Sequence, residues 1–228
     1  MYSFPQFVSR CSTRALVRFV KSAALPVAAA LLCAHPAVAQ CSNTDFGAPK
    51  DIRVYGDFDG DGKLDYAFFR PSTGYWCVRF FQAPNTVEAL QFGLPGDIPV
   101  PADYDGLGIT NFAVWRPSNG NWYIKSNTAQ GIYSVQFGLP GDIPITGVFD
   151  TALCVNPGVP AGCVTNPKAS LAVWRPSNGT WYITQNNNGG AVVTHQWGLS
   201  GDVPLAGDFD GDGKQDLAVW RPSNGYFY

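Results

Sequence analysis

A short unit occurs four times along this chain, and that repetition limits the folds open to it more than any other feature. Its first marker is an aromatic residue followed by arginine, proline and serine, at Phe69–Ser72, Trp115–Ser118, Trp174–Ser177 and Trp220–Ser223. The four arginines are 46, 59 and 46 residues apart. A second marker, an aromatic residue followed by glycine, begins copies near residues 46, 92, 137 and 197. Self-similarity at this period is typical of repeat architectures.

The pattern inside each copy is that of β-structure. In the fourth copy a turn-rich segment is followed by the apolar run 217–220, and Asn224-Gly225 is a strong signal for a tight hairpin. The same hairpin signal recurs at Asn119-Gly120 and Asn178-Gly179, each followed by another aromatic strand. Four antiparallel strands in about 46 residues predict an all-β fold, a β-propeller of about four blades. A linear β-solenoid is the main alternative.

The long third interval indicates an insertion between Phe149 and Ser170. Composition agrees with a turn-rich globular protein, because Gly (25) and Pro (18) are frequent and only 14% of residues are charged. Lys and Arg number 15 against 17 for Asp and Glu. This balance provides no basic surface for nucleic acid or anionic membranes, so neither is expected as a partner.

Residues 1–39 have the features of a secretory signal peptide. Four basic residues precede the apolar run 23–34, and Ala37-Val38-Ala39 offers small residues for cleavage before Gln40. The apolar run is too short to span a bilayer. We therefore expect residues 40–228 to form an exported repeat region, secreted or at the cell surface and not inserted in the membrane.

Two aspartate-rich loops carry the clearest chemistry. Each has carboxylates at positions 1, 3, 5 and 9, glycine at position 6 and a lysine carbonyl at position 7, a spacing that wraps a loop around a hard cation such as calcium. The expected metal ligands are Asp57, Asp59, Asp61, Lys63 and Asp65 in the first copy, and Asp208, Asp210, Asp212, Lys214 and Asp216 in the fourth. The alternative is a turn whose aspartates only cap backbone amides.

The middle copies depart from this pattern. The second keeps Asp103 and Asp105 but has Leu107 at position 5 and Asn111 at position 9, which predicts weak or absent metal binding. The third keeps only Asp150 and contains Cys154 and Cys163 in its insertion. In an oxidising compartment we expect these cysteines to pair, which leaves Cys41 to pair with Cys77. The Cys154–Cys163 bond is hypothesised to brace the third loop in place of calcium.

The segments GDFDGDGKLDYAFFRPS, ADYDGLGITNFAVWRPSNG and GDFDGDGKQDLAVWRPSNG resemble the FG-GAP or VCBS-type repeats of exported bacterial proteins, whose calcium loops are similar to those of integrin α chains. The resemblance covers residues 46–228. It implies a calcium-stabilised β-propeller, usually non-catalytic and used for adhesion or ligand binding. Such propellers commonly have more blades, about seven. Here the fourth copy lacks its outer strand, so either residues 41–46 supply that strand and close a four-bladed ring, or the chain is part of a larger propeller.

Other repeated residues have structural and functional interpretations. One aspartate per copy (Asp51, Asp97, Asp142 and Asp202) and one arginine per copy (Arg70, Arg116, Arg175 and Arg221) predict one ion pair per blade or blade junction. The tryptophans after the hairpin turns, Trp76, Trp122 and Trp181, are expected mainly in the core, and are the candidate platform if a sugar is bound.

Catalysis has little support, since His195 and Glu88 are the only histidine and glutamate after residue 39. We expect a non-catalytic calcium-binding module that recognises a protein or a glycan outside the cell. The alternative is a structural or accessory region of a larger secreted enzyme, such as one that degrades polysaccharides. A catalytic domain in a longer reading frame would distinguish the two.

Overall fold

The computed structural model describes residues 41, 46–150, 166–185 and 190–228. These residues form fifteen strands and, within the described ranges, no helix. The strands are β1 (Ile52–Gly56), β2 (Asp65–Arg70), β3 (Tyr75–Arg79), β4 (Glu88–Gln91), β5 (Ile98–Pro99), β6 (Phe112–Arg116), β7 (Asn121–Lys125), β8 (Ile132–Gln136), β9 (Ile143–Gly147), β10 (Ser170–Arg175), β11 (Thr180–Gln185), β12 (Ala191–Gln196), β13 (Val203–Gly207), β14 (Asp216–Arg221) and β15 (Tyr226–Phe227). No helix in these ranges is long and apolar enough to cross a membrane.

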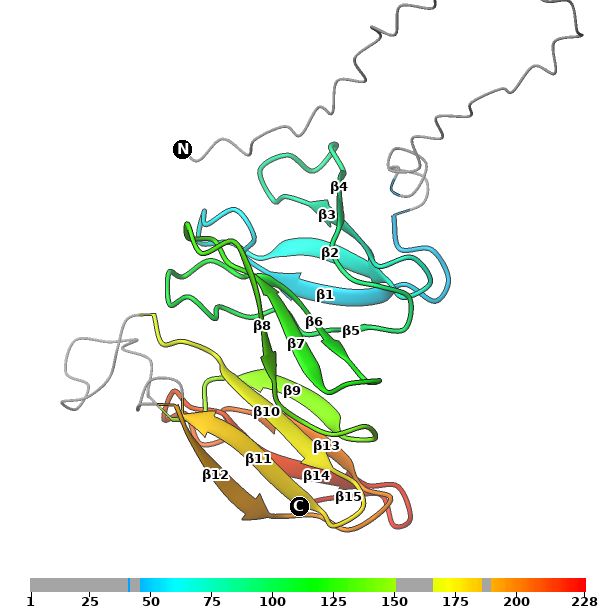
Figure 1. The fold of residues 1–228 in the computed structure, drawn as a ribbon, viewed down its shortest axis with the longest axis vertical. Coiled ribbons are helices and arrows are strands. Elements are labelled where there is room, and N and C mark those ends of the chain that lie inside the picture. The colour runs from blue at the N-terminus through cyan, green and yellow to red at the C-terminus, as the bar shows by residue number, and fades with distance from the viewer. Residues whose placement is uncertain (1–40, 42–45, 151–165, 186–189) are drawn as a thin grey trace, which may run out of the picture. The chain divides into compact units, whose positions relative to one another are not determined.

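The strands form four antiparallel sheets, which follow one another along the chain (Figure 1). Their orders are β1-β2-β3-β4, β5-β6-β7-β8, β9-β10-β11-β12 and β13-β14-β15, and we call them blades 1 to 4. Neighbours in sequence are neighbours in each sheet, as tight hairpins require. The predicted all-β fold with four propeller-type blades is thereby confirmed.

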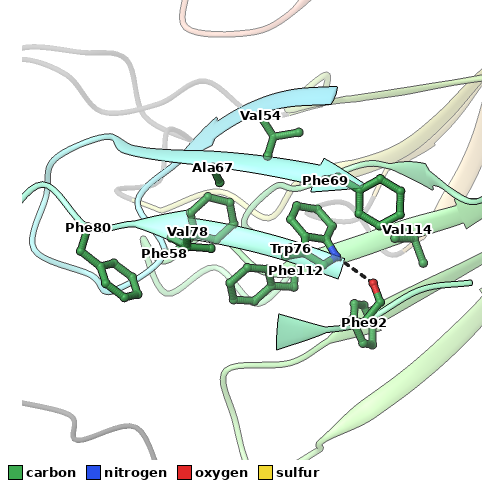
Figure 2. Packing of buried hydrophobic residues seen from close by; sticks show 10 residues of the cluster. All are labelled: Val54, Phe58, Ala67, Phe69, Trp76, Val78, Phe80, Phe92, Phe112 and Val114. Atoms are coloured by element: carbon green, nitrogen blue, oxygen red, sulfur yellow. Dashed lines mark hydrogen bonds between the residues drawn. The ribbon is translucent and has the colours of Figure 1, made fainter. Parts of the chain in front are cut away.

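The core lies between consecutive blades. Alternate residues of each second strand point to opposite faces, so Ala67 and Phe69 of β2 pack toward blade 2. Figure 2 shows that Phe112 and Val114 of β6 complete this cluster from the other side. A second cluster joins blades 2 and 3 and a third joins blades 3 and 4. None of these three clusters combines residues of blade 1 with residues of blade 4.

In blades 1 to 3 the hairpin turn meets the aromatic-glycine marker at one end of the blade. The hairpin glycine and the glycine of the aromatic-glycine marker approach so closely that a Cβ on Gly120 would collide with the Gly138 carbonyl oxygen, and one on Gly179 with that of Gly198. The carbonyl of the marker aromatic also accepts an indole N–H, as from Trp76 to Phe92 at 2.7 Å (Figure 2). These contacts fasten the fourth strand to the hairpin that precedes it.

Blade 4 differs from the others because its outward face is uncovered. Phe209 and Phe227 are 67% and 69% exposed, whereas the corresponding Phe58 and Trp76 of blade 1 are buried. The described sheet of this blade has three strands. Cys41 and Phe46, at the two ends of the segment considered for the missing strand, contact blade 1 instead: Cys41 is bonded to Cys77 and Phe46 packs on Phe68. Residues 42–45 lie outside the described ranges.

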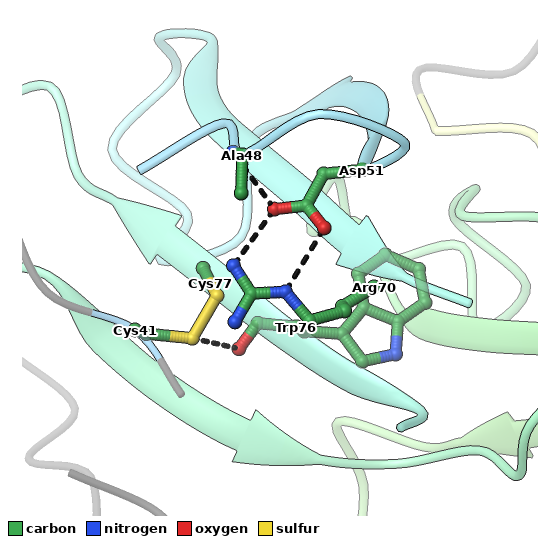
Figure 3. The surroundings of a disulfide bond; sticks show 6 residues. All are labelled: Cys41, Ala48, Asp51, Arg70, Trp76 and Cys77. Atoms are coloured by element: carbon green, nitrogen blue, oxygen red, sulfur yellow. Dashed lines mark hydrogen bonds and ion pairs between the residues drawn. A yellow bond between two sulfur atoms is a disulfide. The ribbon is translucent and has the colours of Figure 1, made fainter. Parts of the chain in front are cut away.

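The predicted Cys41–Cys77 disulfide is confirmed, with a Cα to Cα separation of 5.5 Å (Figure 3). Strand β10 starts at Ser170, where the insertion was expected to end. The predicted signal peptide and the predicted Cys154–Cys163 bond fall outside the described residues.

Candidate metal centres

The loop of residues 57–64 connects β1 to β2 and turns around the side chain of Asp57. One carboxylate oxygen of Asp57 accepts hydrogen bonds from the amides of Gly60 (2.6 Å) and Asp61 (3.2 Å), and the other accepts from Gly62 (2.7 Å). Gly60 and Gly62 both have φ +81°, a region that glycine enters without strain. The alternating glycines therefore allow the backbone to curl around the first aspartate.

The loop of residues 208–215, between β13 and β14, repeats this geometry. Asp208 accepts from the amides of Gly211 (2.7 Å) and Gly213 (3.0 Å). Because the capping bonds are the same in both loops, part of the alternative interpretation holds: position 1 does cap the turn.

Three carboxylates converge in each loop. Ligand oxygens of Asp57, Asp59 and Asp61 all lie within 4.8 Å of one another, and so do those of Asp208, Asp210 and Asp216. The fourth predicted aspartate, Asp65 in the first loop and Asp212 in the other, lies outside the converging group. Asp65 accepts from the amides of Phe58 (2.8 Å) and Phe81 (2.9 Å), and Asp212 accepts from the amide of Lys214 (2.9 Å). Each loop thus brings together three of its four predicted carboxylate ligands.

The crowding of like charges shows in the acidities of the first loop. Loss of solvent raises the pKa of Asp59, and the charges of Asp65, Asp61 and Asp57 raise it further. Burial likewise raises the pKa of Asp65, although two backbone amides oppose the shift. In contrast, a hydrogen bond from Gln82 lowers the pKa of Asp61. A cation placed among these oxygens would relieve the repulsion that raises the pKa of Asp59.

The donor set fits a hard cation. The converging atoms are carboxylate oxygens, to which the carbonyl oxygens of Lys63 and Lys214 could add, and no sulfur or imidazole belongs to either group. Oxygen ligands from a flexible loop suit calcium, while magnesium demands stricter octahedral geometry and zinc prefers nitrogen and sulfur. The residues present are therefore compatible with calcium.

The second-copy loop keeps the turn but satisfies its acids with protein donors. Asp103 accepts from the amides of Gly106 (2.7 Å) and Gly108 (2.6 Å), just as Asp57 and Asp208 do in their loops. Asp105 accepts from the side-chain amide of Asn111 (2.8 Å) and from the backbone amide of Asn127 (2.7 Å). The buried Asn111 side chain, at position 9, therefore donates a hydrogen bond to Asp105 where the other two loops have a carboxylate.

The predicted ion pairs are confirmed in all four blades. Each arginine donates through Nε and Nη2 to the two oxygens of its aspartate, at 2.8 to 2.9 Å; the pairs are Arg70–Asp51, Arg116–Asp97, Arg175–Asp142 and Arg221–Asp202. Figure 3 shows the first pair, in which Asp51 also accepts from the amide of Ala48. The same ion pair therefore stabilises each of the four blades.

A tyrosine that completes this arrangement was missed. The guanidinium of Arg116 lies 4.2 Å from the ring centroid of Tyr123, and Tyr182 and Tyr228 lie 4.3 Å from their arginines. In blade 1 the same position is Cys77, so a disulfide stands where the other blades have a cation–π contact. The signal was available, because a tyrosine follows the arginine by seven positions in the second, third and fourth copies.

The candidate sugar platform is in the core. Trp76, Trp122 and Trp181 are fully buried and donate their indole N–H to the carbonyls of Phe92, Phe137 and Trp197. They cannot stack on a ligand from outside, because blade packing covers them, so the structural interpretation of these residues holds and the platform interpretation does not.

No protein-family model matches the chain, and no curated protein matches it.

Proposed function

We propose that this chain is an exported, non-catalytic β-propeller module of the FG-GAP or VCBS type, which binds calcium in two loops and recognises a protein or glycan outside the cell. The observation that carries the proposal is the convergence of three carboxylates in the loops at 57–65 and 208–216. The contrast with the second loop supports it, because that loop has the same turn but replaces the acids at positions 5 and 9. Calcium would fix the blade connections there and take no part in a reaction.

Thermal unfolding tests the calcium sites. The purified protein is unfolded in chelator and then at increasing calcium concentrations. A ligand that binds only the folded state raises stability by about 2.7 kcal/mol per site at one hundred times its dissociation constant. We expect the midpoint to rise with calcium, and a midpoint indifferent to calcium would refute the proposal.

Variants at loop position 3 assign the effect to the two loops. Asp59→Asn and Asp210→Asn should each reduce the calcium-dependent rise, and the double variant should abolish it. Asp105→Asn occupies the same position in the second loop and is the matched control. It should leave the calcium-dependent rise unchanged, because Asp105 already accepts hydrogen bonds from Asn111 and Asn127 and its loop lacks the acids at positions 5 and 9.

A further inference from the structure

The outer face of blade 1 does not follow the pattern of the other blades. On this face Tyr55 of β1 pairs with Tyr66 of β2, and Tyr66 pairs in turn with Arg79 of β3. Arg53 pairs with Phe68 one step along the strands. The result is two adjacent rows of aromatic and arginine side chains on one side of the sheet.

The same positions in the later blades are small and uncharged. Arg53 corresponds to Pro99, Pro144 and Pro204, and Tyr55 corresponds to Pro101, Thr146 and Ala206, as the strand pairings show. In those blades this face packs on the preceding blade, through residues such as Val114, Val173 and Val219. A face that carries Arg53 and Tyr55 instead is unsuited to such packing, because their long side chains would hold a neighbouring blade away.

These side chains line a groove of about 620 Å³, together with Phe46, Phe80, Phe81 and Pro84. That volume lies in the range of small-ligand sites. Tyr55, Tyr66 and Phe81 are 51%, 56% and 51% exposed, a large exposed aromatic surface for a soluble domain. Strands β1 to β3 carry five of the nine lining residues, so that part of the groove is preformed.

The groove is cationic in a protein whose net charge is negative. The guanidinium of Arg79 lies 4.1 Å from the ring centroid of Phe46, and that of Arg53 lies 5.7 Å from that of Phe68. Arg53 also donates to the Tyr55 hydroxyl at 3.4 Å. None of the described lining residues is a carboxylate. The ligand that complements this surface has an anionic group and a face that stacks on aromatic rings.

We propose that this groove binds an acidic oligosaccharide, with sugar rings on the exposed aromatics and a uronate carboxylate on Arg53. The C–H face of a pyranose suits a tyrosine ring, and its hydroxyls can bond the tyrosine hydroxyl. An acidic peptide fits less well, because extended peptides are usually bound at a sheet edge, whereas this groove lies on a sheet face. The inference names the ligand class of the proposed function and rests on it.

Titration calorimetry with a galacturonate trimer tests the site, with cellotriose as the neutral sugar and hexa-aspartate as the acidic peptide. Chelator is present, so that calcium cannot bridge uronates. We expect the galacturonate trimer to bind and cellotriose to bind at least tenfold more weakly. No binding of the galacturonate trimer, equal binding of cellotriose, or tighter binding of hexa-aspartate would each overturn the proposal.

Variants locate the binding. Arg53→Gln and Tyr66→Ser change exposed side chains and should each lower the affinity for the galacturonate trimer at least tenfold. Lys125→Gln removes a cation and Tyr226→Ser an exposed ring elsewhere, so both should stay within about twofold of the parent. Equal affinities in all four variants would show that the sugar binds outside the groove.

A thermal scan in calcium on each preparation keeps the two proposals separate. Arg53→Gln and Tyr66→Ser should retain the cooperative transition and its calcium response, which shows that they are folded. A protein that responds to calcium but does not bind the galacturonate trimer would overturn this inference alone. A protein that binds it without any calcium response would overturn the calcium sites and leave the groove supported.

Discussion

The aspartate of each arginine pair is nearly buried and uses both of its oxygens. Asp142 accepts from Nε and Nη2 of Arg175 and from the amide of Leu139. Hydrogen bonding to Asp142 also raises the pKa of Arg175. In Asp142→Asn the amide would turn an N–H group toward a donor and leave the guanidinium without a counter-charge. We expect a loss of about 3 kcal/mol in the free energy of unfolding, measured with urea in chelator.

A surface pair provides the control for this variant. Lys214 and Asp212 are 3.6 Å apart and both are largely exposed. Solvent screens such pairs, so Lys214→Ala should change the free energy of unfolding by no more than about 0.5 kcal/mol under the same conditions. Losses of similar size in the two variants would show that the buried pairs do not hold the blades together.

At the scale of the element, blades 1 to 3 each contain a close approach of two glycines. Gly179 has φ +65°, and a Cβ there would meet the Gly198 carbonyl oxygen. Gly131 has a similar φ of +73° but faces open space. Gly131→Ala should therefore cost only the backbone strain, about 1 kcal/mol, whereas Gly179→Ala should cost about 3 kcal/mol because the fourth strand must also move. Urea unfolding of both variants measures the difference, and equal losses would contradict it.

Much of this architecture could be predicted from sequence, since the arginine and glycine markers repeat at a fixed spacing and each turned out to have one structural role. The ion pairs followed from counting one Asp and one Arg per copy. Whether the tryptophans are buried or exposed could not be predicted in this way. A Trp-Tyr pair suits a core or a surface equally well until the position of the neighbouring blade is known. The groove on blade 1 was also missed. It is formed by Arg53, Tyr55 and Tyr66, whose importance lies in how they differ from the repeat.

At the scale of the whole molecule, blades 1 and 4 differ in how much of their outward faces is covered. The outer face of blade 1 carries the Cys41–Cys77 disulfide, Phe46 on Phe68, and Arg79 over Phe46. Blade 4 has no comparable cover among the described residues, and Trp220 is 36% exposed where Trp174 is buried. The interblade core stabilises a blade from both sides only in the interior of the array, so local opening should be easiest in blade 4.

Hydrogen exchange followed residue by residue can detect this gradient. Amides of β14 should exchange at least tenfold faster than those of β10, a difference of about 1.4 kcal/mol in opening free energy, because one face of β14 lacks a neighbouring blade. Amides of β2 should stay as slow as those of β10, since the core shared with blade 2 buries one face of β2, and the Cys41–Cys77 disulfide and Phe46 on Phe68 cover part of the other. Calcium should slow exchange in β14 through the adjoining loop at 208–216. If β14 exchanges as slowly as β10 in chelator, its exposed aromatic face must be covered in solution, and sedimentation would show whether a second copy covers it.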